Sequence, residues 1–79
     1  MKLYCVRDVK SLSYNSPFAA ENDLTAARLF ESEVKSGGGL PSKFPADFEL
    51  VVVGTFDPSS ATVGDLPTEV LLNGMAFQE

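Results

Sequence analysis

The stretch KFPADFELVVVGTFDPSSATVG, which runs from Lys43 to Gly64, decides the fold of this chain. Its middle, ELVVVGTF, is rich in the β-branched and aromatic residues that favour β-strands. Prolines and turn residues stand before and after this segment. We therefore expect a strand over residues 49–56, followed by a turn or long hairpin loop over residues 57–67. The fold then depends on what covers the two faces of this strand.

Both faces of the predicted strand are largely apolar. Side chains of a strand alternate between its two faces. One face carries Phe48, Leu50, Val52 and Phe56, and the other carries Val51 and Val53. A single helix covers one face of a small sheet. The other face must therefore be covered by the proline-rich loops, by a second copy of the chain or by a ligand. Because small domains gain stability by self-association, we expect a homo-oligomer, with a closed dimer favoured.

One helix is predicted over residues 24–36. Asn22 or Asp23 offers the N-cap, and the glycines at 37–39 offer a left-handed stop. Apolar side chains recur at helical spacing on one face, at Ala26, Ala27, Phe30 and Val34. Phe30 is the largest of them, so we expect it to bury against the sheet together with Phe48 or Leu50.

The remaining segments give an α+β fold. Strands are predicted over residues 2–9 and 68–74, and the tail at 75–79 could add a fourth strand. Residues 11–22 and 40–48 have the Ser, Asn and Pro content of loops. The order is β-α-β-β(-β), with one helix packed on a small sheet. The connection is long enough for the first two strands to pair in parallel through a right-handed crossover.

Length and composition predict one soluble domain over residues 1–79. The chain has 44% apolar residues and a net charge of −5, which opposes non-specific attraction to polyphosphate or to anionic membranes. Cys5 has no partner for an intrachain disulfide. The chain has neither a long apolar run at its start nor a segment long enough to span a membrane, so we expect a cytosolic protein.

The composition argues against an enzyme. The chain has no histidine, which excludes a Ser/His/Asp triad and a Cys/His nucleophile pair. Acidic residues near turns, such as Asp57 and Asp65, are explained by turn hydrogen bonding, so we predict no metal site. The glycines at 37–39 follow a helix instead of opening one, which argues against a phosphate-binding loop. No cofactor is predicted.

Basic and aromatic residues alternate in the first half of the chain. Such side chains hold the phosphates and stack on the bases in proteins that bind single-stranded DNA. The candidates for a nucleic-acid site are Lys2, Arg7, Lys10 and Lys43 for phosphates, and Tyr14 and Phe18 for stacking. The same aromatic residues are also ordinary core candidates, and the net charge opposes strong DNA binding.

Motifs spread along almost the whole chain resemble one viral family. They are Y-x-V-x-D-x-K at residues 4–10, Y-x-x-P-F at 14–18, A-x-R-x-F at 26–30, K-x-P-x-D-F-x-L at 43–50 and G-x-F-D at 54–57. Gly64, Pro67, Val70 and Gly74 continue the pattern. In this order and spacing, the chain resembles the small nonstructural protein of gokushoviruses, which are Microviridae related to chlamydia phage. Each motif alone is weak, and residues 34–45 are richer in glycine than the family's usual turn.

The resemblance implies a bacteriophage protein that acts in the cytoplasm of the infected bacterium and is not a structural component of the virion. Such proteins are described as nonstructural, and in part as DNA-binding, by analogy with a coliphage protein that directs genome synthesis toward packaging. The resemblance thus favours binding of single-stranded DNA, or help in the switch from genome replication to packaging.

An alternative stays open at this point. The chain could be an interaction module that binds a phage or host protein, oligomerises through its sheet and has no affinity for DNA. A surface that gathers Lys2, Arg7, Lys10 and Lys43 would favour DNA, whereas scattered basic residues would favour the protein partner.

Overall fold

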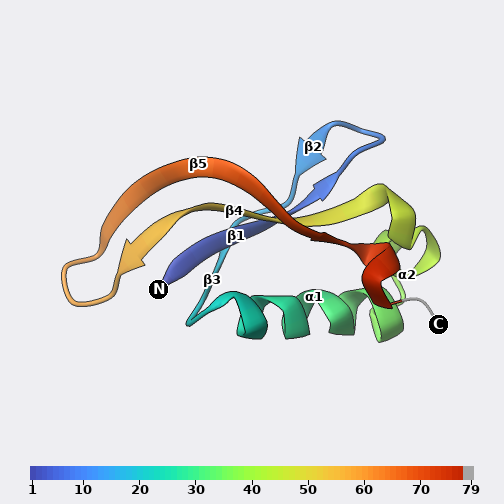
Figure 1. The fold of residues 1–79 in the computed structure, drawn as a ribbon, viewed down its shortest axis with the longest axis horizontal. Coiled ribbons are helices and arrows are strands. Elements are labelled where there is room, and N and C mark those ends of the chain that lie inside the picture. The colour runs from blue at the N-terminus through green and yellow to red at the C-terminus, as the bar shows by residue number, and fades with distance from the viewer. Residues whose placement is uncertain (78–79) are drawn as a thin grey trace.

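The computed structural model describes residues 1–77 and has one main helix on one face of an antiparallel sheet (Figure 1). The predicted α+β class is confirmed. The elements in order are β1 (Lys2–Asp8), β2 (Ser13–Tyr14), β3 (Phe18–Ala20), α1 (Asp23–Ser36), α2 (Leu40–Lys43), a 3-10 turn (Pro45–Asp47), β4 (Phe48–Asp57), β5 (Thr62–Asn73) and a second 3-10 turn (Gly74–Phe77).

The strands lie in the order β2-β1-β4-β5, and β3 pairs with β1 as well. Every pairing in this sheet is antiparallel. The parallel pairing that the connection length allowed for the first two predicted strands does not form. After β1 the chain reverses direction through β2 and β3. Helix α1 then carries it across the sheet to β4, which lies on the other side of β1.

The segment at residues 11–22, predicted as a loop, contains β2 and β3. Arg7 pairs with Tyr14, and Tyr4 pairs with Phe18, so the two short strands together follow β1 along its length. Pro17 lies between them and has no N–H to donate, which explains why the return strand is interrupted.

Helix α1 is confirmed, and its ends form as local chemistry predicts. The Asn22 side chain accepts a hydrogen bond of 2.9 Å from the Thr25 backbone N–H. Gly38 has φ +72°, the left-handed conformation that glycine adopts easily. Ala26, Phe30 and Val34 are buried. The next segment, predicted as a loop, forms the short helix α2 and a 3-10 turn.

Strand β5 begins six residues before the predicted start, at Thr62 in place of residue 68. Val52 pairs with Glu69 and Gly54 with Asp65, so Leu66–Thr68 bulge out opposite Val53 alone. This bulge falls where Figure 1 shows β5 arching away from β4. A methyl group on Gly54 would lie 2.5 Å from the Gly64 carbonyl oxygen, so this close strand contact requires glycine.

The predicted fourth strand is wrong over residues 75–77, because Gly74–Phe77 forms a 3-10 turn. The rest of that prediction, at residues 78–79, lies outside the described residues. Phe77 packs edge-on against Phe30, with 5.9 Å between the ring centroids. The chain thus returns to the helix after β5.

The core lies between α1 and the sheet. Phe30 belongs to one buried cluster with Phe48 and Leu50, as predicted. On the opposite face, Cys5 and Val51 are only 6% and 0% exposed, although they lie outside that cluster. These two residues are therefore buried within one chain, without the second copy or the ligand that the sequence left open as covers of this face.

Candidate functional site

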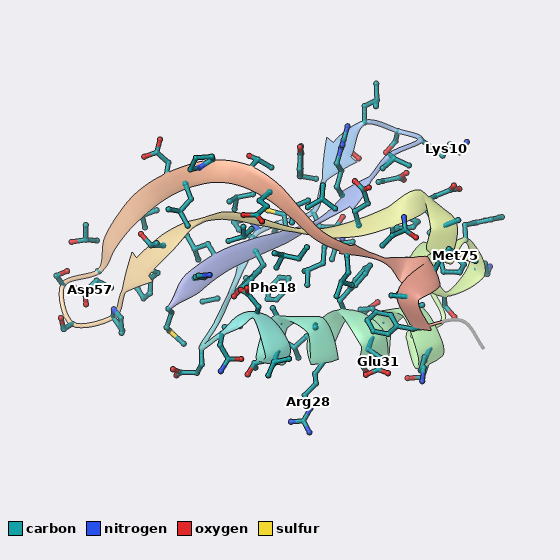
Figure 2. All side chains as sticks on the ribbon, viewed as in Figure 1. Lys10, Phe18, Arg28, Glu31, Asp57 and Met75 are labelled. Carbon is teal, nitrogen blue, oxygen red and sulfur yellow. The ribbon has the colours of Figure 1, made fainter. Side chains whose placement is uncertain are left out.

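The hairpin formed by β1 and β2 brings together three of the six predicted nucleic-acid residues. The Arg7 guanidinium lies over the Tyr14 ring, 5.8 Å from its centroid, which is within the range of a cation–π contact. Tyr14 is 51% exposed. Lys10 is exposed in the connecting turn, and Figure 2 places it at the outer end of the hairpin.

The charge of Arg7 is partly neutralised within the sheet. Its Nη1 lies 3.6 Å from Oε1 of Glu49 on β4, the strand on the other side of β1. Arg7 Nε and Glu49 Oε1 are buried atoms that have no hydrogen-bond partner within residues 1–77. Because this carboxylate is fixed beside the guanidinium, Arg7 attracts a phosphate less than a free cation would.

Lys2 lies at the opposite end of β1 and is paired with the start of α1. Its Nζ is 3.4 Å from Asp23 Oδ1, and the Tyr4 hydroxyl donates a 2.7 Å hydrogen bond to the same oxygen. Burial, with the Asp23 carboxylate second, raises the pKa of Tyr4 to about 12. The hydrogen bond from Tyr4 and the nearby Lys2 lower the pKa of Asp23. These contacts tie β1 to the helix, so Lys2 has a structural role.

Phe18 and Lys43 are placed apart from the hairpin tip. The Phe18 ring stacks on Tyr4 at 5.8 Å, partly buried against the core, and in Figure 2 it lies between the sheet and α1. The Phe18 ring therefore contributes to the packing of the core. Lys43 is exposed at the end of α2, outside the hairpin. The six candidates do not form one basic surface.

A second surface, which sequence reasoning missed, is the outer edge of β5. Every residue from Thr62 to Val70 is exposed except Gly64, which is partly buried. Apolar and acidic side chains are mixed along it, and we call these five residues the β5 surface: Val63, Asp65, Leu66, Glu69 and Val70. A signal was present in the sequence, because all six Lys and Arg residues lie before residue 44 and only acidic charges follow.

A shallow groove lies between α1 and β3. Its apolar lining comes from Val6, Phe18, Leu29 and Phe30, with Glu33 at the helix side. It offers room for an apolar side chain. Within residues 1–77, no group of three or more His, Cys, Asp or Glu side chains could hold a metal ion. Burial raises the pKa of the Cys5 thiol, which disfavours the reactive thiolate form.

Comparison with known proteins identifies a family. None of the helices within residues 1–77 is both long and apolar enough to cross a membrane. No curated protein and no solved structure matches the chain. Residues 1–77 match the model of the Phage ORF5 protein family, which covers nearly the whole chain. This chain therefore belongs to the Phage ORF5 protein family.

Proposed function

We propose that this chain is a nonstructural gokushovirus protein that works in the cytoplasm of the infected bacterium by binding another protein, without catalysis. Membership of the Phage ORF5 protein family supports the phage origin. The motif order at residues 4–57 supports the narrower assignment to gokushoviruses.

The observation that carries this proposal is the distribution of charge over the fold. Lys2 and Arg7 are each paired with a carboxylate, and Lys35 is paired with Glu31 at 3.3 Å. All charged side chains of the β4–β5 hairpin are acidic. A molecule with this arrangement repels polyphosphate along the β4–β5 hairpin, whereas a protein partner can match both its charges and its exposed apolar residues.

Binding of single-stranded DNA is a second candidate, supported by the hairpin of β1 and β2. Arg7 and Tyr14 form a cation–π contact on this hairpin, and Lys10 lies at its turn, away from Asp57 at the tip of the β4–β5 hairpin (Figure 2). Only two of these residues can neutralise phosphates. The slope of log affinity against log salt should then be near −1.4, in place of the value near −3 expected for four cations.

Self-association belongs to the same proposal. With Cys5 and Val51 buried inside one chain, the outer face gives less reason for a dimer than the sequence indicated. Exposed Leu12 and Tyr14 at the β2 edge offer an alternative contact. The homodimer therefore stays a prediction, for which we propose that edge as the contact.

Parallel binding measurements separate the two candidates. The purified chain is immobilised and exposed in turn to each purified protein of the phage and to phage single-stranded DNA at about 50 mM salt, where charges are weakly screened. We expect saturable binding of one of the proteins and no retention of DNA. The opposite result would replace this proposal by the second candidate. In that case the wild type retains DNA and binds none of the proteins, and an Arg7→Ala/Lys10→Ala double variant loses the DNA.

A further inference from the structure

We propose that the β5 surface binds an extended segment of another protein that carries Lys or Arg side chains, by adding it as a further strand to the sheet. The inference rests on the proposed function and names the surface and the chemistry of the partner. It does not require that the partner be of phage origin.

The first support is the open edge of the sheet. β5 is the last strand in the order β2-β1-β4-β5, and within residues 1–77 no strand pairs with its outer side. Backbone N–H and C=O groups along such an edge can pair with a further strand. Figure 1 shows the start of β5 at the end of the molecule beyond the helix, so α1 does not cover it.

The second support is the pattern of exposed side chains. Val63 is 67% exposed and Val70 is 48% exposed. They lie at the two ends of the β5 surface, with Leu66 between them at 36%. A strand laid along this edge would cover apolar area at three points and gain free energy from its burial.

The third support is the sign of the charge. Asp65 and Glu69 are exposed and form no ion pair within residues 1–77. No Lys or Arg lies anywhere in β4 or β5 to pair with them. Opposite charges across neighbouring strands stabilise the pairing, and like charges oppose it. A partner strand with Lys or Arg at matching positions is therefore favoured.

The same charges argue against a second copy of this chain as the occupant. Two β5 strands related by a two-fold axis would bring Asp65 and Glu69 near the same acidic residues of the other copy. Neither strand carries a basic residue that could neutralise them. Pro67 also lacks an N–H, and it lies in the bulge at the middle of the strand. These features protect the edge from self-pairing while leaving it open to a basic segment on either side of the bulge.

The test uses a labelled octapeptide that alternates lysine and valine as the probe. Fluorescence anisotropy should show saturable binding to the full chain at about 50 mM salt, weakened as salt rises. An octapeptide that alternates glutamate and valine should not bind. A lysine–valine octapeptide with every peptide nitrogen methylated keeps its side-chain charges but has no backbone donor on either edge. It should bind at least about tenfold more weakly if the segment pairs as a strand.

Matched charge reversals locate the contact. Asp65→Lys/Glu69→Lys should weaken binding of the lysine–valine peptide by tenfold or more. Glu21→Lys/Glu33→Lys changes the net charge equally at exposed helix-side positions and should leave binding within about twofold. Unchanged circular dichroism spectra and melting temperatures establish that both variants are folded. Equal losses in the two double variants, or equal binding of the methylated peptide, would overturn the inference.

Amide chemical shifts give an independent readout. Addition of the lysine–valine peptide to the nitrogen-15-labelled chain should shift the amides of Thr62–Val70 most. Largest shifts in α1 or in β2 would overturn the inference. A phage protein that binds wild type and Asp65→Lys/Glu69→Lys equally well would also overturn it, yet leave the proposed function standing. Exclusive binding of DNA would instead reject the proposed function.

Discussion

Replacing Phe30 with alanine should remove a large part of the folding free energy of this domain. Phe30 is 1% exposed and lies in the cluster that joins α1 to the sheet. Its ring also packs edge-on against Phe77, 5.9 Å away, so its loss loosens the C-terminal turn as well.

The expected magnitude follows from complete burial. A Phe→Ala change at a fully buried site costs about 3–5 kcal/mol, which includes the cavity left behind. A domain of this length has a total stability of roughly 4–12 kcal/mol. Phe30→Ala should therefore remove between about a quarter and all of the stability of the chain. Leu29, the next residue of α1, is 50% exposed and provides a matched control.

Urea denaturation followed by circular dichroism measures the difference. With a slope near 1 kcal/mol per molar urea for so small a domain, the midpoint of Phe30→Ala should fall by about 3 M or more. Leu29→Ala should cost about 1 kcal/mol or less, because water already reaches half of its side chain. If both variants shift the midpoint by the same amount, our assignment of the buried helix face is wrong.

Four further predictions concern contacts of single residues and the oligomeric state. In Tyr4→Phe, Asp23 loses the hydrogen bond that lowers its pKa in the folded chain. The stability that this bond contributes is present above the ordinary Asp pKa of 3.8 and is lost as pH falls through the lower pKa of Asp23 in the folded chain. The stability difference from wild type, measured by urea midpoints, should thus shrink between pH 7 and pH 2, and a constant difference would contradict this assignment. Tyr4 itself, with a pKa of about 12, should make wild-type stability fall between pH 10 and about 12, a loss that Tyr4→Phe should reduce. Gly54→Ala should lower the free energy of unfolding by about 1–3 kcal/mol, because its methyl group would meet the Gly64 carbonyl. Gly39→Ala should cost much less, because the nearest atom to a methyl group there is 3.8 Å away. Equal costs would refute the strand contact. Sedimentation equilibrium at tens of micromolar should show a homodimer that persists in Asp65→Lys/Glu69→Lys, and a species of monomer mass alone would remove the dimer prediction.

The elements predicted well are those set by local chemistry. The cap at Asn22 and the buried face at Ala26, Phe30 and Val34 are read from neighbouring residues, and α1 forms as expected. The centre of β4 is equally clear, since an uninterrupted apolar segment bounded by turn residues has few alternatives.

The elements missed are those that depend on distant partners. Residues 13–14 and 18–20 have the composition of a loop, and they become strands because β1 offers an edge to pair with. Because the chain reverses direction through them, β1 and β4 pair antiparallel, not in the parallel arrangement that the connection length allowed. Similarly, Pro67 and Asp65 disfavour a strand locally, but an edge strand with a bulge tolerates them.

The candidate site was predictable only in part for the same reason. The contact between Arg7 and Tyr14 depends on the pairing of β1 with β2, which the sequence did not indicate. Whether Lys2 is free or paired depends on the position of Asp23 in space. The one-sided charge of residues 44–79 was visible in the sequence, but its significance required the open edge of β5.

Site-specific photo-crosslinking in bacteria that carry the phage genome tests the central claim most directly. A benzoylphenylalanine placed at Val63 samples the β5 surface, one at Tyr14 samples the β1–β2 hairpin, and one at Leu24, 80% exposed on α1, is the control. We predict an adduct of Val63 with a protein whose crosslinked segment carries Lys or Arg, an adduct of Tyr14 with a second copy of the chain only, and none from Leu24. An adduct of Tyr14 with DNA, together with none from Val63, would contradict the account.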